Sequence, residues 1–82
     1  MNTEQILERL ELLFTILQYT TIKTDVLTAG ERICINMERA SLFELLDFNA
    51  GLRENAECRN YKVSPEIEKK IQSNINTINL SK

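Results

Sequence analysis

The stretch from Ile6 to Leu17 constrains the fold more than any other part of this chain, because it is apolar around most of a helical circumference. One stripe at helical spacing consists of Ile6, Leu10, Leu13 and Leu17. Four more apolar residues widen that stripe: Leu7, Leu12, Phe14 and Ile16. The polar remainder is expected to face water: Glu4, Glu8, Arg9, Glu11, Thr15 and Gln18. A helix this apolar must be covered on more than one side, so we expect either the central rod of the fold or half of a subunit interface.

Length and composition indicate one small soluble domain over residues 1–82. Hydrophobic residues make up 43% of the chain and charged residues 27%, which argues against intrinsic disorder. The net charge of −2 gives no general attraction to nucleic acid or to an anionic membrane. The sequence shows no apolar run that would cross a bilayer, no secretory signal and no disulfide framework. We therefore expect a cytoplasmic protein, with Cys34 and Cys58 as reduced thiols.

Residues 20–37 alternate between apolar and polar side chains in two short runs that flank a glycine. The first run contains Ile22, Thr24 and Val26, and the second contains Ile33, Ile35 and Met37. Between them, Gly30 is free to take the positive φ of a turn. This pattern predicts a β-hairpin and thus an α+β fold of order α-β-β-α-α, with the hairpin packed on helices. The apolar residues of the stretch also fit helical spacing, so an all-helical bundle is the alternative.

Two further helices are expected after residue 37. The segment Ser41–Glu44 has capping-box spacing and precedes an apolar cluster, so a second helix is predicted to begin there and to stop at Gly51. A third helix is predicted to begin at Ser64 and Pro65, where serine caps and proline occupies the first helical position. Its narrow apolar stripe consists of Ile67, Ile71, Ile75 and Ile78. We expect this third helix to dock on the first.

Residue types that carry catalysis are missing or scattered. The chain has no histidine, the commonest general base and metal ligand, and its two cysteines lie far apart in sequence. Neither glycine belongs to a phosphate-binding pattern. We interpret three close pairs of carboxylates as solvent-facing charge: Glu8 with Glu11, Glu54 with Glu57, and Glu66 with Glu68. We therefore expect a protein that is not an enzyme and holds neither a metal nor a cofactor.

Five residues remain as candidate contacts for a ligand or partner: Arg32, Arg39, Arg53, Arg59 and Tyr61. If the fold gathers them, they would form a basic patch with an aromatic ring for stacking. Acidic residues stand beside these arginines in the sequence, which favours an ordinary salt-bridged surface over nucleic-acid binding.

The remaining interpretation is interaction with another protein. The small size, the acidic balance and the surplus of apolar residues favour a non-enzymatic binding module, such as an inhibitor or modulator of the kind found in phage and mobile elements. We also expect self-association as a homodimer or larger homo-oligomer, with Leu12, Leu13 and Ile16 as candidate interface residues. Two alternatives stay open: a homo-oligomer that binds an anionic, nucleotide-like ligand through the arginines, and a nucleic-acid-binding regulator.

Overall fold

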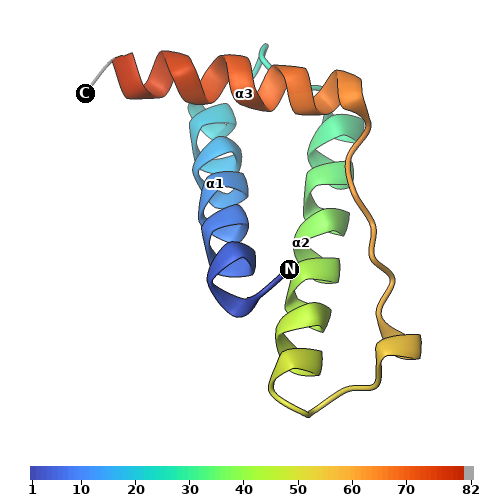
Figure 1. The fold of residues 1–82 in the computed structure, drawn as a ribbon. Coiled ribbons are helices and arrows are strands. Elements are labelled where there is room, and N and C mark those ends of the chain that lie inside the picture. Colours follow the sequence, from blue (N-terminus) through green and yellow to red (C-terminus); the bar gives the residue numbers. More distant parts are fainter. Residues whose placement is uncertain (81–82) are drawn as a thin grey trace.

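The computed structural model describes residues 1–80 and shows three α-helices joined by loops (Figure 1). Helix α1 spans Thr3–Ile22, α2 spans Ala29–Asn49 and α3 spans Pro65–Leu80, with a short 3₁₀ helix, η1, at Asn55–Glu57. α1 and α2 run antiparallel as a helical hairpin, and α3 crosses both near the end where they are connected. The segment between α2 and α3 returns along the side of α2. The fold is therefore all-helical.

The predicted β-hairpin over residues 20–37 is wrong, because the described residues contain no strand. Its first run belongs to the last turn of α1 and the loop that follows, and its second run lies inside α2. Thr20 and Thr21 are β-branched, but they fit the helix because their hydroxyls donate to the carbonyls of Ile16 and Leu17, four residues earlier. Within α2, Ile35 is fully buried, whereas Ile33 and Met37 are exposed. The apparent alternation therefore marks no half-buried strand.

The second helix begins at Ala29, twelve residues before the predicted start at Ser41. Thr28 accepts a hydrogen bond from the backbone N–H of Glu31, and the Glu31 side chain accepts one from the N–H of Thr28. This reciprocal pair is a capping box, so the segment that resembled a turn is a helix start. Gly30 lies in the first helical turn and needs no positive φ. Ser41 is buried in the middle of α2 and caps nothing.

The predicted end of α2 and the predicted start of α3 are confirmed. Asn2 caps α1 through a box with Gln5, and Ser64 accepts a hydrogen bond from the N–H of Ile67 at the start of α3. α2 ends at Asn49, and Gly51 takes the left-handed conformation at φ 79°. α3 packs on α1, as predicted.

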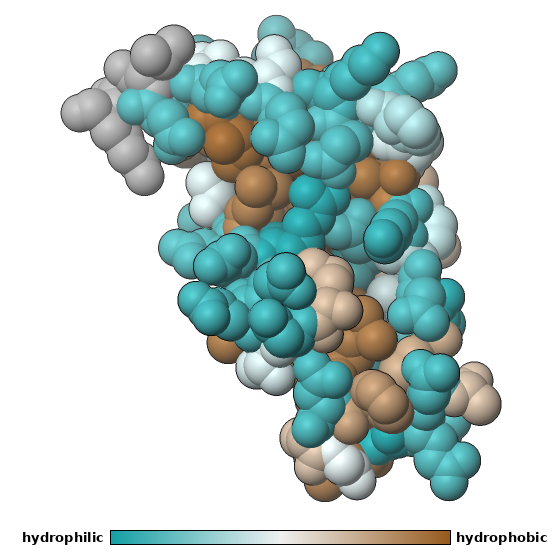
Figure 2. All heavy atoms as spheres, in the orientation of Figure 1, coloured by the Kyte–Doolittle hydropathy of each residue, from teal (hydrophilic) through white to brown (hydrophobic). Residues whose placement is uncertain are grey.

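The core lies where α3 crosses the helical hairpin. Its most deeply buried apolar side chains are Ile6, Leu13, Ile16, Ile35 and Ile71, contributed by all three helices. On the side shown in Figure 2, apolar residues appear as separate brown patches between teal polar side chains. Within residues 1–80, no helix combines the length and the apolar character needed to cross a membrane.

Candidate functional site

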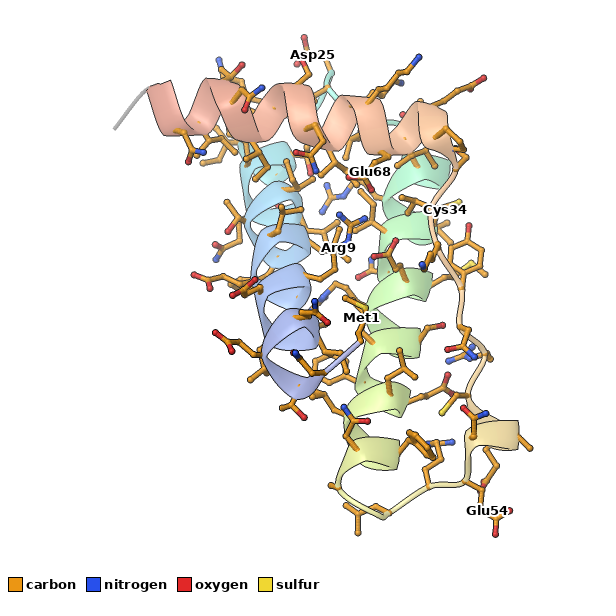
Figure 3. The ribbon with its side chains drawn as sticks, viewed as in Figure 1. Met1, Arg9, Asp25, Cys34, Glu54 and Glu68 are labelled. Carbon is orange, nitrogen blue, oxygen red and sulfur yellow. The ribbon has the colours of Figure 1, made fainter. Side chains whose placement is uncertain are left out.

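The three helices meet at one arginine. Arg9 of α1 points into the space between α2 and α3, with Glu68 of α3 beside it (Figure 3). Its Nε donates to Glu38 Oε2 of α2 at 2.6 Å, and its Nη2 donates to Glu38 Oε1 at 3.2 Å. The same guanidinium donates to both carboxylate oxygens of Glu68, at 2.5 and 3.1 Å. One cation therefore joins all three helices through two bidentate contacts.

This ion-pair cluster of Arg9, Glu38 and Glu68 is partly shielded from water. Glu38 is only 4% exposed. Burial by itself would lower the pKa of Arg9, but the hydrogen bonds to Glu38 and Glu68 outweigh burial and raise that pKa. The hydrogen bond from Arg9 lowers the pKa of Glu68 below its ordinary value of 4.5. Arg9 and Glu68 thus stay charged at neutral pH.

Two polar groups of α2 hold the segment that precedes α3. The backbone N–H of Val63 donates to Glu38 Oε1 at 3.0 Å, and the backbone N–H of Tyr61 donates to Ser41 Oγ at 3.1 Å. A hydrogen bond with Cys34 raises the pKa of the Tyr61 hydroxyl. Glu38 and Ser41 are both buried. They accept hydrogen bonds from the N–H groups of Val63 and Tyr61, which lie in a loop and have no helix or strand partner.

A pocket of about 490 Å³ opens beside the ion-pair cluster. Much of its apolar wall is formed by Leu42, Leu45, Val63 and Pro65. The ion-pair cluster and Lys62 contribute the charged part. Each carboxylate of the cluster already accepts hydrogen bonds from Arg9, and the Ser41 hydroxyl accepts one from the backbone N–H of Tyr61. These contacts tie the three helices together. Within residues 1–80, no three His, Cys, Asp or Glu side chains cluster as a metal site would require.

The opposite side of the helical hairpin is open. On α1, Leu7 and Phe14 lie about 160° and 140° around the helix from Arg9, and on α2 Phe43 lies about 140° from Glu38. These three side chains are 53%, 49% and 50% exposed. The guanidinium carbon of Arg39 lies 5.8 Å from the centre of the Phe14 ring, which places α2 and α1 side by side on this surface. We call the surface formed by Leu7, Phe14, Arg39 and Phe43 the open face.

The structure does not gather the predicted contact residues into one patch. Arg53 and Arg59 converge on Glu44, at 3.9 and 3.2 Å, and these contacts lower the pKa of Glu44. Arg32 lies at the other end of α2, where it donates to the carbonyl of Thr20. Arg39 lies on the open face, and Tyr61 lines the pocket instead.

The predicted self-interface residues lie inside the chain. Leu13 and Ile16 are almost completely buried in the core, and Leu12 is half-buried against it. Their side chains are covered by the chain's own helices.

Sequence reasoning missed the ion-pair cluster entirely. It predicted that Arg9 faces water and that Glu68 belongs to a solvent-facing pair. In the structure, the Arg9 guanidinium of α1 donates hydrogen bonds to the Glu68 carboxylate of α3. One signal was present: Arg9 stands three residues after Ile6 and four before Leu13, next to the buried stripe. A charge in that position needs an opposite charge from another element.

No protein-family model, no curated protein and no solved structure matches this chain.

Proposed function

We propose that this chain is a non-enzymatic protein-binding module, and that the partner on its open face is a second copy of itself. The observation that carries the proposal is the exposure of Leu7, Phe14 and Phe43 together on one side of the helical hairpin. Large apolar side chains gathered on one surface are typical of an interface, whereas scattered ones are ordinary. A cytoplasmic location fits the two free cysteines, Cys34 and Cys58.

The overall dimensions support a partner. The Cα radius of gyration is 13.5 Å, whereas a compact chain of this length would have about 12 Å. The accessible surface is 5562 Å², against about 5,000 Å² for a monomer of this mass. The single chain thus leaves more surface open than a typical small domain.

The size of the open side also fits an interface between two copies. α1 and α2 contain 20 and 21 residues, so each is about 30 Å long, and side by side they present a width of about 20 Å. Allowing for side-chain relief, this area approaches the roughly 800 Å² per partner of a standard interface. Half-exposed aromatic rings near its centre are the residues that dominate binding energy in such interfaces.

The test is the solution mass of Phe14→Ser by light scattering, compared with the wild type over a dilution series. Ile33→Ser is the matched control, because Ile33 is also an exposed apolar residue of the hairpin but lies about 80° around α2 from Phe43, toward the outer side of the helix. We expect a dimeric wild type, a dimeric Ile33 variant and a monomeric Phe14 variant. A wild type that stays monomeric at millimolar concentration would overturn the proposal.

A further inference from the structure

The two helices that form the open face, α1 and α2, carry unpaired charges of opposite sign. Along α1, Glu4, Glu8 and Glu11 form no ion pair among the described residues. The one basic residue of α1, Arg9, is already paired with Glu38 and Glu68 in the ion-pair cluster. The surface of α1 is therefore acidic and has no cation of its own to balance it.

The situation on α2 is reversed. Its acidic residues all have cationic partners: Glu31 pairs with Lys70, Glu38 with Arg9, and Glu44 and Asp47 with arginines of the following segment. Its own arginines, Arg32 and Arg39, form no ion pair within residues 1–80. The Nε of Arg39 also lacks a hydrogen-bond acceptor there. The unpaired charge of α2 is therefore positive.

We propose that two copies pack through their open faces as an antiparallel four-helix bundle, with α1 of each copy against α2 of the other. This arrangement rests on the proposed function and specifies its geometry. A two-fold axis parallel to the helices places the acidic helix of one copy opposite the basic helix of the second. The other face-to-face arrangement, with the axis across the helices, would place α1 on α1 and α2 on α2. Like charges would then face each other on both helices, which disfavours it.

The contacts within one chain also set the register between the copies. Arg9 contacts Glu38 and Thr3 contacts Asn49, so Leu7 of α1 lies level with residues 40–45 of α2. A two-fold axis parallel to the helices preserves this level. Leu7 of one copy then lies opposite Phe43 of the second copy, while α3 and the pocket of each copy stay on the outer sides.

Cysteine cross-linking tests this register in a background of Cys34→Ser and Cys58→Ser. An equimolar mixture of Leu7→Cys and Phe43→Cys chains, mildly oxidised, should give mainly the mixed disulfide, because the two positions lie within bonding range only in the α1-to-α2 packing. A dominant disulfide between two Leu7→Cys chains would overturn the inference but leave the proposed function standing. A wild type without any dimer would overturn both.

Charge reversal gives a second readout that does not depend on the cysteines. Glu11→Lys and Arg39→Glu should each raise the dimer dissociation constant at least about fivefold, because each places like charges across the interface. The double variant should return close to the wild-type value. A double variant as weak as the two single effects combined would contradict the packing of α1 against α2.

Discussion

The two sides of the helical hairpin differ in the side chains they carry and in how those side chains are satisfied. The side that carries α3 holds charged and polar groups, and each has a partner in the same chain: Arg9 with Glu38 and Glu68, and Ser41 with the N–H of Tyr61. The open face holds aromatic and aliphatic groups that the chain leaves half exposed. Directional contacts therefore position α3 together with its buried Ile67 and Ile71, whereas the open face offers non-directional apolar area. Hydrogen bonds and ion pairs fix one arrangement of the helices within a chain. An exposed apolar surface flanked by charged residues is suited to binding a partner.

Among the substitutions that test this difference, Arg9→Met is expected to lower the free energy of unfolding most. Removing the cation leaves Glu38 buried without its partner, which should cost about 3–5 kcal/mol of unfolding free energy. Urea unfolding followed by circular dichroism measures the loss. Adding Glu38→Gln, which removes the stranded charge and keeps an acceptor for Val63, should recover part of it. Equal stability of wild type and Arg9→Met would show that the cluster does not hold the helices together.

A pair of leucine substitutions on α1 sharpens the contrast between the two sides. Leu13 is fully buried and Leu7 is 53% exposed, so Leu13→Ala should cost about 2–5 kcal/mol and Leu7→Ala much less in the monomer. Thermal melts at a concentration low enough to dissociate the dimer give both values. Similar melting temperatures for the two variants would mean that α1 does not face the core as described.

Acid should lower the stability that the ion-pair cluster gives to the side with α3. Hydrogen bonds hold the pKa of Glu68 below the ordinary 4.5, so its carboxylate contributes stability above about pH 4.5, and this contribution is lost as the pH falls through the lower, folded value. The melting temperature should be nearly flat from pH 7 to 5 and then fall. Glu68→Gln should reduce the fall, while Glu11→Gln, which removes a carboxylate without an ion pair, should retain it. A melting temperature that rises below pH 4.5 would contradict this account.

The smallest expected effect concerns the start of α2. Gly30 lies in the first helical turn, and an added Cβ would meet only Thr28 Oγ1, at 3.9 Å. Gly30→Ala should therefore raise the unfolding free energy by about 0.5–1 kcal/mol, because alanine loses less backbone entropy in a helix. Had residues 28–31 formed the turn of a β-hairpin, as the alternation suggested, the same change would destabilise the protein. Thermal unfolding distinguishes the two signs.

The sequence predicted two helix ends correctly, the end of α2 and the start of α3, but it missed the start of α2 at Ala29. Gly51 and Ser64 were read correctly because a cap depends on residues within one turn. The hairpin prediction failed because Ile33 and Met37, which completed the alternation, are exposed side chains with no sheet to face. The site was beyond reach for a related reason: Arg9, Glu38 and Glu68 are separated by 29 and 30 residues, and only the crossing of α3 brings them together.

The most direct test of the central claim is a dilution series of ¹H–¹⁵N correlation spectra of the wild-type protein. If the open face is the interface, amide shifts that depend on concentration should be confined to α1 and α2 around Leu7, Phe14 and Phe43. The amides around Val63 and Glu68, on the side with α3, should not move. Shifts that centre on the pocket and α3 instead, or spectra that do not change with concentration, would contradict the account.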